Sequence, residues 1–378
     1  MIRPRALPAT FLATLALCSA CGAGDAGRSA DDTPGLDYAY DGKCELSSGH
    51  AGDSLCLGVP EPAEGFQLHY GPSRYDDPAE VGRFLLEPGE ELTDCLYMTT
   101  PNDTEVFWRD YHLRARTGTH HVIVYTGSSE MPDGTLGVCD LGTDMRFFVG
   151  AQSGLDESGV VLDVPLPGSQ TLPENRGHAQ RLAPRSRVAF QMHYVNTGKQ
   201  PILREGWVNF HYLPAAEVEV VIDPIFFIGG LGMDVQPGSR EVVSARGCTL
   251  PDSGPDELRI MGLSGHMHAH GLRFSAWTVG ADGARTLVYD TYDWEEPLNA
   301  QYDSGHDYPA PDPEAQTEGA WSGILTVRRG ETLDWECEID NDLAEPLRFG
   351  NKAYTGEMCN LFGWYAPSVG EPWSCFRQ

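Results

Sequence analysis

The most regular patterns in this sequence repeat every two residues. Over residues 187–195 large apolar side chains alternate with smaller or polar ones, and over residues 332–339 Leu333, Trp335 and Cys337 alternate with acidic residues. This period is typical of β-strands that face a core. No long stretch has apolar residues at helical spacing, and the 43 glycines and 27 prolines suit short strands joined by turns. We therefore expect an all-β protein.

The length of the chain and a break between two strand-like segments predict two domains. A chain of 378 residues exceeds the size at which single cores stop growing. A strand-like segment at 207–213 ends before Pro214, and new alternation begins at residue 218. We expect two consecutive antiparallel β-sandwich domains of jelly-roll-like form, covering residues 43–215 and 216–378.

The N-terminal segment has the features of an export signal. Arg3 and Arg5 precede an apolar run at 6–17 that is too short to stay in a bilayer. Cys21 resembles the processing site of a bacterial lipoprotein, which predicts residues 1–21 as signal and Cys21 as the lipidated residue. Residues 22–42 lack apolar periodicity and predict a flexible tether. We expect an exported cell-envelope protein, lipid-anchored at the outer face or in the periplasm and otherwise secreted, that meets the membrane only through this anchor.

Charge and cysteine content narrow the partners and the compartment. The 55 acidic and 26 basic side chains give a formal charge of −29, which repels phosphate backbones, so nucleic acid is not expected as a partner. The cysteines beyond the signal are even in number and include no Cys-x-x-Cys pair, which favours four disulfides over a zinc or redox site. These cysteines are Cys44, Cys56, Cys95, Cys139, Cys248, Cys337, Cys359 and Cys375.

Six residues in four segments have the side chains of a metal site: His120, His121, His193, His266, His268 and Met358. Each alone has an ordinary explanation, because twelve histidines produce close pairs by chance and methionine usually fills gaps in a core. On a strand, His266 and His268 would share a face and can bind one ion. His120 and His121 would point to opposite faces, unless the backbone is bulged or the two rings use different nitrogens.

In this order the four segments resemble the copper type II, ascorbate-dependent monooxygenases, the family of peptidylglycine α-hydroxylating monooxygenase and dopamine β-monooxygenase. The resemblance covers roughly residues 95–375. It implies one copper ion bound by His120, His121 and His193, and a second bound by His266, His268 and Met358, with a copper-lined cleft between the domains. It also implies four disulfides, Cys95–Cys139, Cys337–Cys359, Cys248–Cys375 and Cys44–Cys56.

The resemblance further implies that a small-molecule substrate is hydroxylated at a C–H bond by O2, with ascorbate as the reductant. A thioether is a soft ligand that favours Cu(I), so the site with Met358 would meet oxygen, and the all-histidine site would supply the second electron. Gln191 and Asn360 occupy positions that the family uses near the cleft, which makes them candidates for polar catalytic roles. His270 falls outside the ligand pattern, so a structural role beside the metal is expected.

Two positions depart from the peptide-amidating members of the family. Those members bind a substrate carboxylate with an arginine and a tyrosine at the positions that here hold Ser264 and Phe362. Without this charged clamp we do not expect peptide amidation.

Two other classes of function also fit the sequence. A non-catalytic copper carrier of the cell surface would keep the ligands without an open coordination position. A carbohydrate-binding sandwich would instead use exposed aromatic residues as a sugar platform, with Trp364, Tyr365 and Trp373 as candidates.

Overall fold

The computed structural model describes residues 44–127, 129–140, 145–152, 160–165, 177–252, 254–303 and 305–378. The predicted signal, lipidated Cys21 and tether lie outside these ranges. Regular structure within them is almost all β, and the helical elements are the five-residue helix α1 (Pro78–Gly82) and the 3-10 turns η1 (Asp53–Leu55) and η3 (Ala215–Glu217). No helix in these ranges is long and apolar enough to cross a membrane. The predicted all-β class is confirmed.

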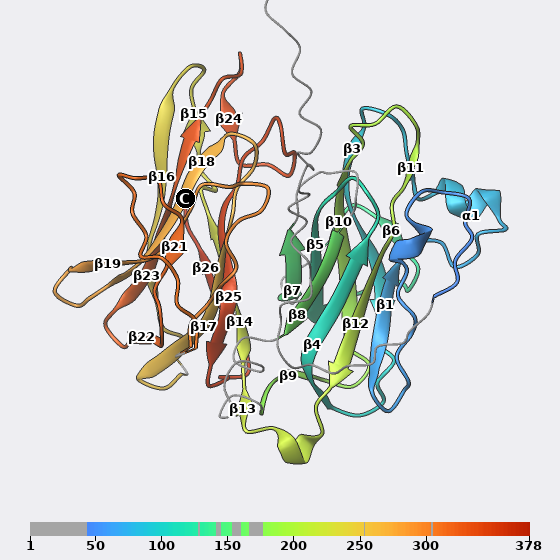
Figure 1. Cartoon of the computed structure of the whole chain (residues 1–378), viewed down its shortest axis with the longest axis horizontal. Helices are drawn as coiled ribbons and strands as arrows, with labels where there is room; N and C mark the ends of the chain where they lie inside the picture. The colour runs from blue at the N-terminus through green and yellow to red at the C-terminus, as the bar shows by residue number, and fades with distance from the viewer. Residues whose placement is uncertain are drawn as a thin grey trace, which may run out of the picture. The chain divides into compact units, whose positions relative to one another are not determined.

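The N-terminal half contains two main sheets with a core between them (Figure 1). The strands of the first, in spatial order, are β1 (Gly65–Tyr70), β12 (Gly206–Tyr212), β4 (Val106–Ala115), β9 (His178–Leu182) and β13 (Val220–Val221), with β8 (Val160–Pro165) also paired to β4. Those of the second are β6 (Leu136–Gly137), β3 (Glu91–Thr99), β10 (Arg187–Val195), β5 (Thr119–Gly127) and β7 (Arg146–Gln152). Strands β2 (Leu85–Leu86) and β11 (Ile202–Leu203) form a small ribbon.

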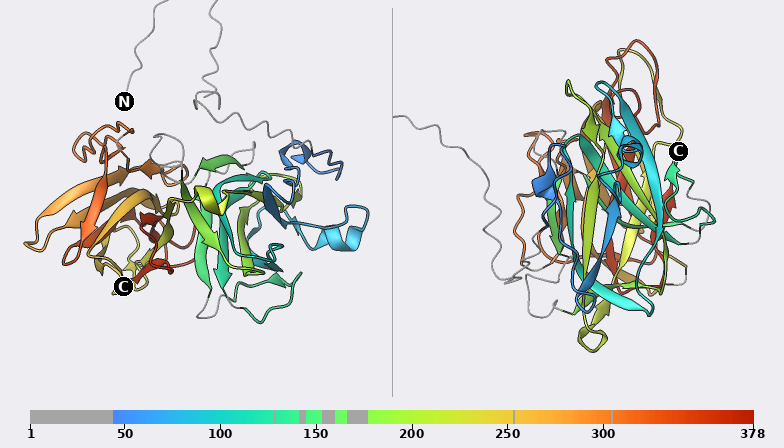
Figure 2. Two further views of the ribbon diagram at one scale, coloured as in Figure 1. Left: turned by 90° about the horizontal axis from the view of Figure 1, so that it is seen from below. Right: turned by 90° about the vertical axis from the view of Figure 1, so that its right-hand side faces the viewer.

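The C-terminal half repeats this arrangement, and Figure 2 gives two further views of the layered strands. One sheet has the order β20 (Ala300–Gln301), β17 (Glu257–His266), β25 (Cys359–Ala366), β14 (Asp223–Gly229) and β26 (Trp373–Phe376), with β22 (Leu325–Arg328) also paired to β17. The other has the order β16 (Arg240–Thr249), β23 (Thr332–Asp340), β18 (Gly271–Val279), β19 (Arg285–Thr291) and β21 (Gly319–Ala320). Strands β15 (Asp234–Val235) and β24 (Leu347–Arg348) form a second ribbon.

Alternation in the sequence explains the central strands. In β23 the side chains of Leu333, Trp335 and Cys337 are fully buried in the core of the C-terminal half, as predicted. In β10 both faces are buried. Phe190 and Met192 on one face fill the core, while Gln191 and His193 on the other face lie against a second packed surface. The chain therefore places polar side chains where no water-exposed face exists.

The sheets are mixed rather than purely antiparallel. Strand β13 pairs in parallel with β9, and β26 pairs in parallel with β14. The predicted division after residue 215 falls in η3, but β13 follows η3 and still belongs to the first sheet of the N-terminal half. The described residues form one compact unit, so the division into two domains stays a prediction.

An apolar contact joins the two halves beside strands β5 and β17. The ring of Phe147 in β7 stacks on those of Phe226 in β14 and Phe362 in β25, with centroids 5.4 and 5.2 Å apart. Met261 of β17 packs into the core of the N-terminal half. Because large apolar side chains interlock here, β5 and β17 are held close to one another.

Four disulfides stabilise these sheets. They are Cys44–Cys56, Cys95–Cys139, Cys248–Cys375 and Cys337–Cys359, the four pairs that the resemblance implies. The last one ties β23 to the first residue of β25. Such a set of disulfides is typical of an exported protein in an oxidising compartment.

Candidate metal centre

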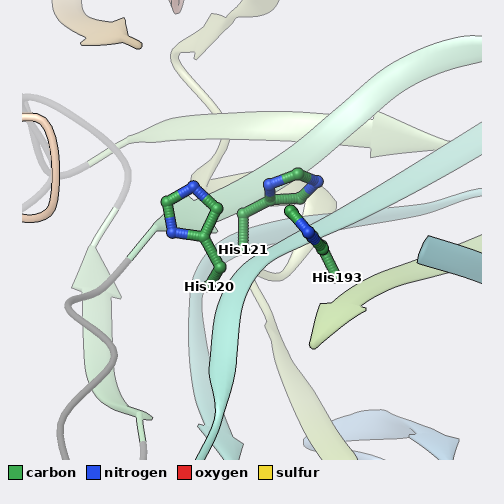
Figure 3. Close-up of side chains that lie close together, drawn as sticks. All are labelled: His120, His121 and His193. Carbon is green, nitrogen blue, oxygen red and sulfur yellow. The ribbon is translucent and has the colours of Figure 1, made fainter. Parts of the chain in front are cut away.

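A β-bulge brings His120 and His121 to the same place. His193 of β10 lies opposite His121 of β5, but the next pair is Tyr194 with Thr119, so His120 is the extra residue of the bulge. The bulge interrupts the alternation that would otherwise send the two rings to opposite faces. Figure 3 shows the side chains of His120, His121 and His193 close together. The ring centroids of His120 and His121 lie 5.2 and 4.9 Å from that of His193. Of the two geometries left open by the sequence, the structure contains the bulge.

The second histidine pair meets by a different route from the one predicted. We expected His266 and His268 to share the face of one strand, but β17 ends at His266 and His268 lies beyond its end. Their ring centroids are nevertheless 5.2 Å apart. The backbone N–H of His268 donates to the carboxylate of Glu357, which fixes the chain after the strand end. The proximity was predicted correctly, and its structural cause was not.

Glu357 is a buried carboxylate that organises this part of the site. It accepts hydrogen bonds from the backbone N–H groups of His268, His270 and Met358. Burial raises the pKa of Glu357 to about 8, against the opposite effect of these N–H donors. One side chain thereby links the loop that carries His268 to the residues that open β25. Glu357 directly precedes Met358 in the chain but was not among the predicted site residues.

Met358 is buried beside the strand that carries His266. Asn360 of β25 lies opposite His266 in the sheet, and its amide Nδ2 is 3.4 Å from the sulfur of Met358. The Oδ1 atom of Asn360 is buried and has no hydrogen-bond partner among the described atoms. The predicted methionine and asparagine therefore lie next to the second histidine pair.

The five histidines form a single imidazole cluster, consisting of His120, His121, His193, His266 and His268. Two groups in it have ligand atoms within 4.8 Å of one another, and His120 belongs to both groups. The centroid of the His120 ring is 5.8 Å from that of His266 and 5.6 Å from that of His268. We expected two sites facing each other across a copper-lined cleft. In this structure the two groups instead touch, because β5 and β17 pack closely.

The hydrogen bonds of the imidazole cluster leave nitrogen lone pairs available. His193 donates from Nε2 to Glu91 Oε1 at 2.9 Å, and its Nδ1 is buried without a partner. His268 donates from Nδ1 to the carbonyl of Gly356 at 3.2 Å, and its Nε2 is buried without a partner. Because carboxylate and carbonyl oxygens only accept, the proton of each neutral ring is on the bonded nitrogen. Metal-ligating histidines have this arrangement, with one nitrogen held by an acceptor and the other on the ion.

His121 follows the same pattern, and burial favours the neutral form of His121, His266 and His268. Its Nε2 lies 3.4 Å from Gln191 Oε1, while its Nδ1 is buried without a partner. Burial, reinforced by the neighbouring imidazoles, holds the pKa of His121 and of His266 well below the usual value and lowers that of His268 to about 4. Neutral rings are required for metal binding, because a protonated imidazole has no lone pair. These residues therefore fit a metal ion.

A pocket adjoins the imidazole cluster. It is lined by His121 and His266 together with mainly apolar residues of β5, β7, β17 and β25. Ser264 and Phe362, the two positions that depart from the peptide-amidating pattern, lie opposite each other in the sheet, and both line this pocket. The pocket thus reaches two of the predicted metal ligands.

Other histidines have structural contacts. His270 binds the carbonyl of Tyr354 through Nε2 and Asp342 through Nδ1, and it belongs to neither group in the cluster. A further set of potential ligands, Asp110, His112 and His211, lies on β4 and β12 and was not predicted. The local sequence does not indicate this set of residues, because Asp110 and His211 meet only through the pairing of β4 with β12.

Two of the three aromatic residues considered for a sugar platform are not exposed. Tyr365 is fully buried and Trp373 is 2% exposed, both in the core of the C-terminal half. Alternation along β25 and β26 places both side chains on the face that is turned toward the core. This prediction of exposure was wrong.

Comparisons with known proteins do not assign this chain to a family. No protein-family model matches the chain, and no curated protein matches it. One match among solved structures is the structure of infectious bursal disease virus Gx strain, with 12% sequence identity over 82% of this chain and 83% of that chain. Its TM-score of 0.11 carries no argument about fold or function. The residues of the site are therefore the ground for a functional proposal.

Proposed function

We propose that this protein is an exported copper-dependent monooxygenase that hydroxylates a C–H bond of a small molecule with O2. The observation that carries the proposal is that five buried histidines form two groups of potential ligands, and that Met358 lies in the chain segment whose Glu357 carboxylate binds the backbone N–H groups of both His268 and Met358. Imidazole and thioether together suit copper, whereas a thioether is a poor ligand for hard cations.

The proposed ligands divide the imidazole cluster in two. His120, His121 and His193 would hold one copper ion, and His266, His268 and Met358 would hold the other. Bound copper would supply one-electron redox steps at each position. The softer donor set, which contains the sulfur of Met358, is the one proposed to meet oxygen, and the all-imidazole set is proposed to deliver the second electron.

The remaining polar residues orient these ligands. Glu91 and the carbonyl of Gly356 would fix the proton of His193 and of His268 on the bonded nitrogen and leave the other nitrogen of each ring to bind metal. Gln191 does the same for His121, and Asn360 has a buried amide oxygen without a hydrogen-bond partner among the described atoms. Both are proposed to position water or substrate.

The proposed reaction needs two external electrons. One C–H bond and one O–O bond are broken, one C–OH bond is formed, and the second oxygen atom leaves as water with two protons. The substrate C–H supplies two of the four electrons that O2 accepts, and two equivalents of a one-electron reductant such as ascorbate supply the others. The disulfides are consistent with this chemistry outside the cytoplasm, and a lipid anchor at Cys21 would hold the protein at the cell envelope.

The test joins metal analysis to oxygen uptake. Copper-loaded protein freed of unbound metal should contain about two copper ions per chain and consume oxygen only when ascorbate is present. Met358→Leu and His193→Ala should each abolish ascorbate-dependent uptake. Matched controls are Met233→Leu, at a buried core position of the same half, and His50→Ala, outside the cluster. Both controls should retain uptake.

Two results would contradict the proposal. Two copper ions per chain without oxygen uptake, under ascorbate or other one-electron donors, would favour a copper carrier. A protein that binds no copper after reconstitution would exclude both the enzyme and the carrier.

A further inference from the structure

The pocket beside the imidazole cluster has a marked chemical character. Apart from His121 and His266, its walls are formed mainly by apolar residues of both halves, among them Ile123, Phe147 and Phe362. Among the described residues that line it there is no lysine, arginine, aspartate or glutamate. A charged ligand would have to leave water without a partner here, which is strongly unfavourable.

Aromatic rings form the wall nearest the proposed oxygen-binding site. The rings of Phe147 and Phe362 are nearly parallel, with centroids 5.2 Å apart and planes at 12°. The centroid of Phe362 lies 6.1 Å from that of His266. A flat apolar group that packs on this wall would lie within reach of the proposed metal ligands.

One residue that lines the pocket has a polar atom without a hydrogen-bond partner among the described atoms. Trp364 lines the pocket, and its indole Nε1 is buried without a hydrogen-bond acceptor among the described atoms. Buried donors of this kind are rare in native proteins, because each leaves a desolvated N–H unsatisfied. A ligand oxygen would satisfy it once the indole shifts toward the pocket. Ser264 adds a hydroxyl on the neighbouring strand.

We propose that this pocket binds an uncharged, mainly apolar substrate that carries one hydrogen-bond acceptor, with the acceptor oxygen on the Trp364 N–H and the apolar body against Phe147 and Phe362. The apolar wall excludes carboxylates and ammonium groups, and the indole N–H selects for a carbonyl, ether or hydroxyl oxygen. The inference rests on the proposed function, since it treats the ligand as the molecule that is hydroxylated. The binding itself does not require metal.

Calorimetry on the metal-free protein tests the binding with three probes of similar size. Acetophenone is neutral and has an acceptor, ethylbenzene lacks the acceptor, and benzoate carries a charge. Acetophenone should bind, ethylbenzene should bind roughly five- to a hundredfold more weakly, and benzoate should give no detectable heat. Benzoate that binds as well as acetophenone, or acetophenone that does not bind, would overturn the inference.

Substitutions locate the binding. Trp364→Phe should reduce acetophenone affinity to that of ethylbenzene and leave ethylbenzene affinity unchanged, which a merely destabilised pocket would not do. Trp321→Phe, at an exposed tryptophan outside the pocket, is the matched control and should change neither affinity. Ser264→Arg should introduce a cation and shift the preference from acetophenone to benzoate. Equal loss of both neutral probes in Trp364→Phe would contradict the assigned hydrogen bond.

The two proposals fail separately. Acetophenone that binds the metal-free protein but is not converted to a product one oxygen atom heavier by the copper-loaded protein with ascorbate would overturn the monooxygenase and leave the pocket's ligand class standing. Ascorbate-dependent oxygen uptake without binding of acetophenone would leave the monooxygenase and overturn the ligand class.

Discussion

Lowering the pH should destabilise the metal-free protein through its buried imidazoles, and His268 is the residue for which the effect can be worked out. Its side chain is fully buried, and burial lowers its pKa to about 4, whereas an imidazole in an unfolded chain titrates near 6.5. Between these values the unfolded chain binds a proton that the folded protein does not. The contribution of His268 to stability is therefore fully present above pH 6.5 and is lost as the pH falls towards 4.

The size of the effect follows from the two pKa values. Between pH 7 and pH 5 the linkage relation gives a loss of about 2 kcal/mol from His268 alone, and about 3 kcal/mol once the pH falls below both values. His121 and His266 act in the same direction, because burial lowers their pKa as well. Glu357, whose pKa burial raises to about 8, acts in the opposite direction over this range, so the contribution of an imidazole is read from the difference between the native protein and a variant that lacks it.

Urea unfolding at pH 7 and pH 5, with a chelator present, measures this loss. From pH 7 to pH 5, the free energy of unfolding of the native protein should fall by about 2 kcal/mol more than that of His268→Asn. His50→Asn, at a partly exposed histidine outside the cluster, should keep the native slope. An identical pH slope for the native protein and His268→Asn would refute the assignment of a buried, neutral imidazole.

Three further perturbations test the supports of the site. Glu91 accepts from His193 and from the backbone N–H of the loop near His268, so Glu91→Gln should weaken copper binding roughly 10- to 100-fold in competition with a chelator. A Cβ at Gly363 would lie 2.0 Å from a backbone oxygen of β17, so Gly363→Ala should lower the free energy of unfolding by about 1–3 kcal/mol or more. At Gly82 no atom lies within 4 Å of such a Cβ, so Gly82→Ala should not lower the free energy of unfolding. Cys337 and Cys359 are 22 residues apart, and replacing both by alanine should lower it by about 3 kcal/mol.

Local sequence was sufficient for the strands and insufficient for the contacts that shape the site. Alternation predicted β10 and β23 because each residue's face depends only on its neighbours in the chain. It could not predict the bulge at His120, which depends on how β5 pairs with β10. It also gave the wrong reason for the His266–His268 pair, because the carboxylate that holds His268 lies 89 residues further along the chain.

The supporting acids were missed for the same reason. Glu91 contacts a residue 102 positions away and a backbone N–H 262 positions away, so no local pattern marks it. The parallel pairs of β13 and β26 likewise join segments whose sequences give no sign of direction. The six candidate ligands were named because the order of their segments resembles a known family, and that resemblance assigned no role to Glu91 or Glu357.

Met358 should decide whether the imidazole cluster binds one copper ion or two. His120 belongs to both histidine groups, but a ring nitrogen with one lone pair can bind only one ion at a time. If His120 joins His121 and His193, the second group retains two imidazoles and needs the thioether as its third ligand. In Met358→Leu the two groups would compete for His120, so copper content should fall from about two to about one per chain while the fold is retained. Copper content that stays near two in Met358→Leu would show that the sulfur is not a ligand and would remove the chemical distinction between the two sites.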